Sequence, residues 1–123
     1  MTQFKRIPNR LMITYEYTVS PVRAVDDINY FEPDELPLSL ETIAQLSAWD
    51  VAFQATYQQD DPLASGFPDE KAEERWKKEG VKIWQQIQNE LGSEYEVFYK
   101  LHHNGRRYVL KNSSELPDDL KVD

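Results

Sequence analysis

The feature that most constrains the fold is a long segment, residues 68–91, in which apolar residues recur every three or four positions. This spacing is typical of a helix that buries one face and exposes the other. Gly80 lies on the apolar face, where we expect it to allow close approach of another backbone. The face consists of Ala72, Trp76, Gly80, Ile83, Trp84, Ile87 and Leu91.

A second amphipathic helix is predicted from Ser39, a typical N-cap residue, to about Tyr57. Asp50 falls within its apolar stripe. An acidic residue at that position either reaches water at the edge of the helix or is buried and paired with a cation. The stripe consists of Ile43, Leu46, Trp49, Phe53 and Tyr57.

A β-hairpin is predicted for residues 95–111. Asn104 and Gly105 are typical of a two-residue type I′ turn, and with that turn Leu101 faces Tyr108. The apolar residues of both strands then lie on one face, whereas the opposite face is mixed and basic. Because neighbouring residues of a strand point to opposite faces, the two histidines after Leu101 cannot form a metal pair, and we expect the second one, beside the turn, to be solvated.

The remaining pattern predicts the fold class. Residues 11–19 alternate between apolar and polar side chains, as in a half-buried strand, and this strand must pair with a later one. Residues 20–39 contain several prolines and acidic residues and are predicted to be a long connection. The order strand, helix, helix, strand, strand predicts an α+β two-layer sandwich, with both helices on one face of a small sheet. We expect a single domain over residues 1–123, with an ordered core at about 10–111 and an acidic C-terminal tail.

The charge of the chain favours a protein partner. The formal net charge is -8, which opposes nucleic-acid binding and attracts a basic protein. We expect two acidic segments, residues 26–41 and 58–70, to face this partner, with Tyr30 and Phe31 or Phe67 as apolar anchors. For Tyr30 and Phe31, packing on the core remains an open alternative. The predicted partner-binding residues are Asp26, Asp27, Tyr30, Phe31, Glu32, Asp34, Glu35, Asp60, Asp61, Phe67, Asp69 and Glu70.

Several classes of chemistry have no support in the sequence. The chain has no cysteine, which excludes disulfides, thiolate metal sites and a cysteine nucleophile. Phosphate-binding glycine loops, nucleophile elbows and zinc spacings are absent, and the acidic segment at residues 58–70 lacks the calcium-loop pattern. We therefore expect that segment to be a turn between helices, and we expect no metal or cofactor. No stretch is long and apolar enough for a membrane span, so we expect a cytoplasmic location.

Residues 34–97 resemble a set of small bacterial proteins associated with toxin and immunity gene neighbourhoods. The shared order is LPLS, a helix with a tryptophan, DP and SGF, a long helix with a tryptophan before EG, then ELG and a strand. The resemblance carries no catalytic residues. It implies a non-enzymatic immunity protein, and the charge favours neutralisation of a basic toxin, such as a nuclease, by occupation of its active-site groove.

Two other classes of function stay open. One is a small enzyme or ligand-binding domain, in which Asp50 works with His102 or Arg107 in a pocket. The other is a homo-oligomeric module formed by pairing of an exposed sheet edge. We expect a monomer or a weak homo-oligomer.

Overall fold

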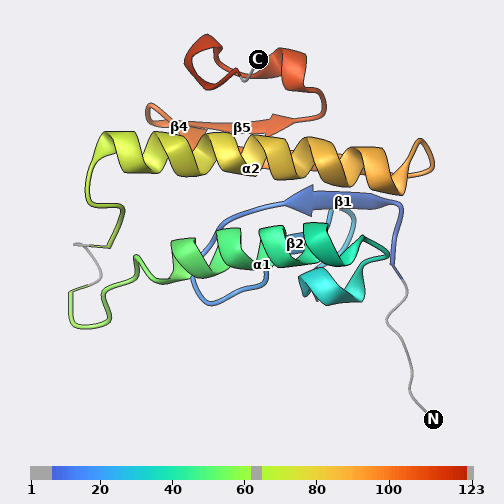
Figure 1. The fold of residues 1–123 in the computed structure, drawn as a ribbon, viewed down its shortest axis with the longest axis horizontal. Helices are drawn as coiled ribbons and strands as arrows, with labels where there is room; N and C mark the ends of the chain where they lie inside the picture. The colour runs from blue at the N-terminus through green and yellow to red at the C-terminus, as the bar shows by residue number, and fades with distance from the viewer. Residues whose placement is uncertain (1–6, 62–64, 122–123) are drawn as a thin grey trace.

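Five strands form one mixed sheet, and two long helices cover one of its faces (Figure 1). The computed structural model describes residues 7–61 and 65–121. The predicted α+β class is confirmed. In chain order the elements are β1 (Arg10–Ile13), β2 (Val22–Ala24), β3 (Tyr30–Phe31), η1 (Pro33–Glu35), α1 (Leu40–Gln54), α2 (Glu70–Leu91), β4 (Glu96–His103), β5 (Arg106–Leu110), η3 (Ser113–Glu115) and η4 (Asp118–Leu120), where η denotes a 3-10 helix.

The strand order in the sheet is β3-β2-β1-β4-β5. β1 therefore lies in the centre, antiparallel to β2 and parallel to β4. The parallel pair confirms that the first strand pairs with a later one, and α1 and α2 together form the crossover that a parallel connection needs. The C-terminal hairpin has the predicted register, with Leu101 opposite Tyr108. Asn104 and Gly105 both have positive φ, as a type I′ turn requires.

The region before α1 differs from the prediction. β2 and β3 lie within residues 20–39, which we predicted to be a connection without strands. These strands have only three and two residues; β2 pairs antiparallel with β1, and β3 pairs antiparallel with β2 at the edge of the sheet. Such short strands leave almost no periodic signal in the sequence.

The first strand is also shorter than predicted, because β1 ends at Ile13 rather than near Val19. Side chains hold the segment that follows. The Tyr15 hydroxyl accepts a hydrogen bond from the main-chain N–H of His102 (2.6 Å) and donates one to its carbonyl (3.1 Å). Tyr15 is thus still buried in the core, although the main-chain hydrogen bonds of β1 to its neighbouring strands have ended.

The helix ends agree with the sequence to within a few residues. Ser39 caps α1 as predicted, since its hydroxyl accepts a hydrogen bond from the N–H of Thr42 (3.2 Å). α2 begins after the N-cap Asp69, whose carboxylate accepts from Ala72 N (2.8 Å), so Pro68, where the predicted helical segment 68–91 starts, precedes the helix. Gly92, with φ of 80°, ends α2 directly after the last residue of the predicted segment.

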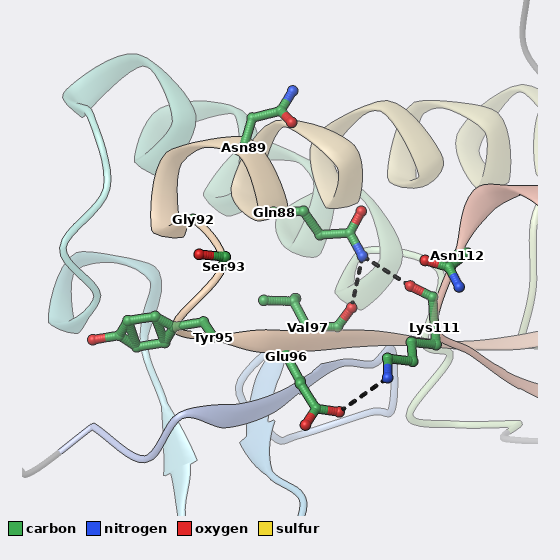
Figure 2. A pocket seen from close by; sticks show the side chains of 9 residues that line it. All are labelled: Gln88, Asn89, Gly92, Ser93, Tyr95, Glu96, Val97, Lys111 and Asn112. Atoms are coloured by element: carbon green, nitrogen blue, oxygen red, sulfur yellow. Dashed lines mark hydrogen bonds and ion pairs between the residues drawn. The ribbon is translucent and has the colours of Figure 1, made fainter.

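Side chains near the end of α2 fasten it to the sheet (Figure 2). The Gln88 amide donates to the carbonyls of Val97 and Lys111, at 3.0 Å each. The Trp84 indole donates to the same Val97 carbonyl (2.7 Å). These bonds satisfy main-chain acceptors under the helix, and they set the distance between α2 and the hairpin.

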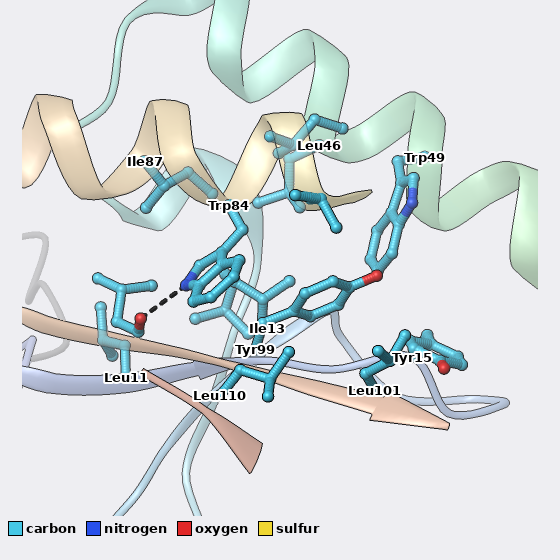
Figure 3. Packing of buried hydrophobic residues seen from close by; sticks show 14 of the residues in the cluster. Leu11, Ile13, Tyr15, Leu46, Trp49, Trp84, Ile87, Tyr99, Leu101 and Leu110 are labelled. Atoms are coloured by element: carbon cyan, nitrogen blue, oxygen red, sulfur yellow. Dashed lines mark hydrogen bonds between the residues drawn. The ribbon is translucent and has the colours of Figure 1, made fainter. Parts of the chain in front are cut away.

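Two tryptophans join α1 to α2. The Trp49 indole donates to the carbonyl of Trp76 (3.0 Å), the Trp76 indole donates to the carbonyl of Trp49 (2.9 Å), and their rings stack with centroids 4.2 Å apart. Trp49 and Tyr99 also point into the centre of the core (Figure 3). A Cβ atom on Gly80 would lie 2.5 Å from the Tyr99 hydroxyl and 2.7 Å from the Trp49 ring. Gly80 therefore leaves room for two aromatic side chains. The prediction that it allows close approach of another backbone is wrong.

The C-terminal segment contributes to the core beyond residue 111. Leu116 and Leu120 are buried with the rest of the hydrophobic cluster. His103, which we expected to be solvated, is also buried. Its Nε2 lies 2.8 Å from Asp119 Oδ2 and its Nδ1 lies 3.5 Å from Lys77 Nζ, so the histidine links the C-terminal segment to α2. Asp123, the last residue of the acidic tail, lies outside the described residues.

Candidate functional site

The predicted partner-binding residues lie in two acidic segments that α1 separates. In the first acidic segment they lie at residues 26–35, which include η1 packed alongside α1. The described part of the second acidic segment is residues 58–61 with 65–70, which follow the other end of α1 (Figure 1). Residues 62–64, within the predicted segment, lie outside the described residues. α1 has 15 residues and is therefore about 22 Å long. The two segments thus flank a helix and do not form one cluster.

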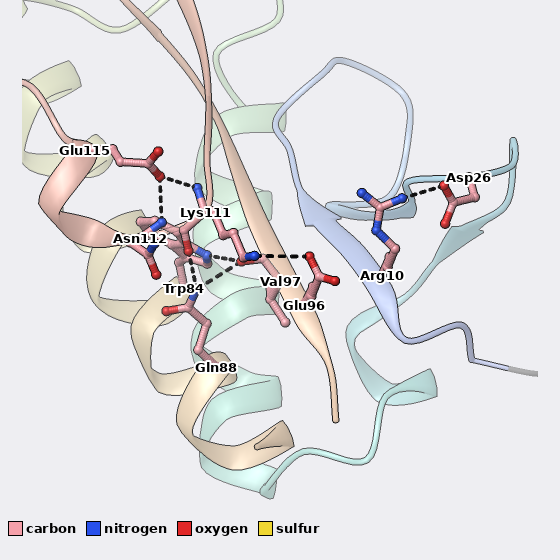
Figure 4. Close-up of polar contacts among 9 residues, drawn as sticks. All are labelled: Arg10, Asp26, Trp84, Gln88, Glu96, Val97, Lys111, Asn112 and Glu115. Atoms are coloured by element: carbon pink, nitrogen blue, oxygen red, sulfur yellow. Dashed lines mark hydrogen bonds and ion pairs between the residues drawn. The ribbon is translucent and has the colours of Figure 1, made fainter. Parts of the chain in front are cut away.

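In the first acidic segment, several carboxylates shape the local chain. Asp26 forms an ion pair with Arg10 (2.7 Å), which ties the turn after β2 to β1 (Figure 4). Asp27 accepts a hydrogen bond from the N–H of Asn29 (2.8 Å). Glu35 accepts from the N–H of Glu32 (2.8 Å) and so caps η1. These three carboxylates therefore stabilise the local conformation of the chain, whether or not they also contact a partner.

The two aromatic residues of the first acidic segment have different environments. Phe31 is only 2% exposed and belongs to the hydrophobic core, so its side chain cannot contact a partner. Tyr30 is half-buried, with the Arg23 guanidinium 5.6 Å from its ring centroid. The core-packing alternative is therefore correct for Phe31, whereas part of Tyr30 remains accessible.

The second acidic segment presents more accessible carboxylates. Asp60 and Asp61 are exposed beyond the end of α1. Asp69 is the N-cap of α2, and Glu70 is exposed in its first turn, where the helix dipole favours negative charge. Phe67 is half-buried, with its ring 5.2 Å from that of Trp76. One part of the Phe67 ring thus packs against the core, and the other part is exposed to solvent.

Part of the first acidic segment meets Asp50 at a surface hollow of about 510 Å³. Tyr30 and Glu32, both predicted partner-binding residues, line the same hollow as Asp50. A volume of this size falls in the range of ligand pockets, about 300–1,000 Å³. The lining residues are Thr18, Val19, Ser20, Tyr30, Glu32, Asp50 and Gln54.

The electrostatics of the Asp50 hollow favour a cation. Burial raises the pKa of Asp50, a hydrogen bond from Gln54 (3.2 Å) partly offsets the rise, and the charge of Glu32 adds to it. Glu32 accepts a hydrogen bond from the Ser20 hydroxyl. Two carboxylates that repel each other across a hollow would both be stabilised by an ammonium or guanidinium group placed between them.

Sequence reasoning missed the residue that shapes this hollow, Gln54. Its amide donates to the Glu16 carbonyl (2.9 Å) and accepts from the N–H of Thr18 (3.0 Å), which has a left-handed φ of 70°. Gln54 therefore fastens the turn after β1 to α1. Its bonds join residues far apart in the chain, and a glutamine near a helix end carries no spacing signal for such contacts.

The structure does not bring Asp50 together with His102 or Arg107, as the enzyme alternative requires. Both side chains lie on the open sheet face, the face opposite the helices, and neither lines the Asp50 hollow. Burial lowers the pKa of His102, and the nearby charges of Lys100 and Arg107 lower it further. An acid-base pair of Asp50 and His102 is therefore not formed.

Another hollow, of about 560 Å³, lies where the end of α2 meets β4 and β5 (Figure 2). None of the predicted site residues line it. Its polar groups bind one another, since Gln88 spans two carbonyls and Lys111 lies 3.7 Å from Glu96. Within residues 7–61 and 65–121 there is no group of three acidic or histidine side chains that could hold a metal ion. No helix in the same ranges is long and apolar enough to cross a membrane.

Residues 9–102 match the Serratia CdiI immunity protein-like family. The chain belongs to this family. The match includes both helices, both acidic segments and the Asp50 hollow, and it confirms the association with immunity proteins that the resemblance implied. Membership suggests that this CdiI-like protein neutralises a toxin, and it implies a toxin as its binding partner. No curated protein matched the CdiI-like chain.

Proposed function

We propose that this CdiI-like protein neutralises a basic toxin, such as a nuclease, in the cytoplasm by covering the toxin's active-site groove with its two acidic segments. The observation that carries the proposal is the exposure of Asp34, Asp60 and Asp61. Within the described part of the chain, none of these carboxylates forms an ion pair with a lysine or arginine. Their charge is therefore available to a cationic partner.

Electrostatic attraction explains how the acidic segments would act. Charges at both ends of α1, together with the net charge of -8, attract a cationic groove before contact and raise the association rate. The hollow between Glu32 and Asp50 has the size and charge to take one lysine or arginine side chain of the toxin. The groove would then be closed to an anionic substrate by charge as well as by volume.

Charge reversal in the second acidic segment tests the proposal. We expect Asp60→Lys with Asp61→Lys to lower the association rate with the purified toxin domain encoded beside this gene by about tenfold at low salt. The matched control is Glu79→Lys with Glu94→Lys, which changes the net charge equally at two exposed positions outside both segments. Stopped-flow kinetics would measure both rates.

Ionic strength provides the second arm of this test. At about 1 M salt the screening length falls to about 3 Å, so the difference between the two variants should nearly vanish. An association rate that does not change with salt would contradict electrostatic steering, even if the toxin binds tightly. In cells, the Asp60→Lys with Asp61→Lys variant should protect less well than the control against expression of the toxin.

The Asp50 hollow supports a second candidate, binding of a small cationic ligand. The hollow has a suitable volume, and a half-buried carboxylate with a raised pKa is a common feature of ligand sites. A thermal-shift screen of small amines and guanidines would test this candidate. A stabilising compound whose effect disappears in Asp50→Asn would support it, and a screen without any stabilising compound would count against it.

A further inference from the structure

The outer face of α1 is apolar although it is exposed to solvent. Its residues recur every three or four positions on the side of the helix opposite the buried Leu46 and Trp49. Leu40 is 85% exposed and Val51 is 65% exposed. We call this surface the outer α1 face, and it consists of Leu40, Ala44, Ala48, Val51 and Ala55.

The fold does not require this apolar surface. Alanine is the best helix former, so helix propensity explains the alanines of the outer α1 face. It does not explain Val51, because a β-branched residue lowers helix propensity and this side chain stays mostly exposed. Contiguous apolar surface on a soluble domain is typical of a protein interaction site.

Acidic residues border the outer α1 face at both ends. Glu41 is exposed in the first turn of α1, and Asp34 is exposed in η1, which packs alongside the helix. Asp60 and Asp61 are exposed beyond the other end. An apolar centre with a charged rim is the usual arrangement of a protein interface. The two predicted acidic segments thus have an apolar surface between them that sequence reasoning did not identify.

We propose that the outer α1 face is the apolar centre of the surface that binds the toxin, and that the toxin meets it with an apolar patch bordered by lysine or arginine. This inference rests on the proposed toxin-binding function. A second copy of this chain fits less well, because a two-fold contact through α1 would place the acidic borders of both copies against each other.

The outer α1 face and the acidic residues that border it should affect different rate constants of toxin binding. Exposed charges act at a distance and mainly change association, whereas buried apolar contacts form late and mainly change dissociation. Loss of the outer α1 face should therefore raise the dissociation rate and leave the salt dependence of association unchanged. This behaviour is the opposite of that expected for Asp60→Lys with Asp61→Lys.

The test variant is Ala48→Gln with Val51→Gln, which adds polar bulk without charge and keeps good helix formers on α1. The matched control is Val109→Gln, since Val109 is 55% exposed on the open sheet face. Surface plasmon resonance with the purified toxin domain encoded beside this gene would give both rate constants. We expect the dissociation rate to rise about 30-fold in the test variant and less than about twofold in the control.

Three results would overturn the inference. If the wild type binds the toxin domain and the test variant binds equally well, the inference is wrong and the proposed function stands. If the wild type does not bind this domain, both are wrong. The third result concerns self-association, which sedimentation would measure. If the wild type is a dimer, and the test variant is a monomer that binds the toxin with unchanged affinity, the outer α1 face binds a second copy of the chain and not the toxin. Unchanged melting temperatures would show that both variants are folded.

Discussion

The two helices cover the same face of the same sheet, yet their outer faces differ. α2 presents charged residues to solvent, among them Glu74 and Lys78, which form an ion pair four residues apart. Glu73 is also exposed, although its partner Lys77 is buried. α1 carries only two acidic residues, Glu41 and Asp50, and no basic residue. Its outer face is apolar, although Leu40 and Val51 are largely exposed.

This difference separates what folding requires from what binding requires. A helix that only covers a sheet is most soluble with a charged outer face, as α2 has. The inner faces of both helices meet at Trp49 and Trp76, so each is needed for stability. The outer α1 face adds nothing to the core, and a partner is the simplest reason to retain it. Mutations on the inner and outer faces should therefore have separable effects.

The largest expected effect comes from removing the shared inner contact. Trp49→Ala should lower the free energy of unfolding by about 3–5 kcal/mol, because it empties a buried volume and deletes the hydrogen bond from the Trp49 indole to the Trp76 carbonyl. The main-chain carbonyl that accepts from the Trp76 indole remains in this variant. Val51→Ala, on the outer face of the same helix, should change it by less than about 0.5 kcal/mol. Urea denaturation measures both values. A cost below about 1 kcal/mol for Trp49→Ala would contradict the importance of the tryptophan pair.

An intermediate effect is expected at Gly80, where the side chains of Trp49 and Tyr99 pack against α2. Gly80→Ala should destabilise the protein by about 2 kcal/mol, because the new methyl group meets the Tyr99 hydroxyl and the Trp49 ring, and the clash outweighs a gain in helix propensity of about 1 kcal/mol. On the outer α1 face the preference should be reversed, and Ala48→Gly should cost about 1 kcal/mol. Thermal and urea unfolding of both variants would show whether alanine is less stable than glycine at position 80 and more stable than glycine at position 48. Stabilisation by Gly80→Ala would mean that the aromatic rings shift easily.

The smallest expected effect concerns Asp50, the half-buried carboxylate on α1. The pKa of Asp50 is raised in the folded state, so its ionised form disfavours folding. This penalty is fully present above the folded-state pKa, shrinks as the pH falls through that value, and is absent below the unfolded-state pKa. Asp50→Asn keeps an oxygen that can accept from Gln54, and it should stabilise the protein at pH 7 by about 0.5 kcal/mol or less.

The pH dependence distinguishes this explanation from a general effect of charge. The gain from Asp50→Asn should disappear near pH 3, where the aspartate is largely protonated in both states. Chemical denaturation at both pH values would measure the difference. A gain of the same size at both pH values would show that the raised pKa is not its cause.

Local patterns predicted much of the fold because their contacts are close in sequence. The register of the hairpin followed from the turn at Asn104 and Gly105, and it agrees with the structure. The N-cap at Ser39 and the end of α2 at Gly92 were also predictable from single residues. β2 and β3 were not, because two or three residues carry no period, and because β2 depends on β1 and β3 on β2 for their hydrogen bonds.

The candidate site was less predictable. The sequence identified the acidic segments, but it left open whether Phe31 packs on the core or faces a partner, and the structure buries this residue in the core. It also identified Asp50 as unusual, but not the hollow that Asp50 shares with Tyr30 and Glu32. Within one strand, neighbouring aromatics point to opposite sides, and only the location of the sheet determines which of them is accessible.

The α+β class, the two helices, the hairpin register and the acidic character of the chain follow from the sequence, because periodicity, turn residues and charge are local properties. The central place of β1 in the sheet and the mutual hydrogen bonds of Trp49 and Trp76 follow only from the packing of the whole chain. These features depend on contacts between residues distant in the chain. Which apolar residues remain exposed after such packing, and so are left for a partner, is settled only when the core is complete.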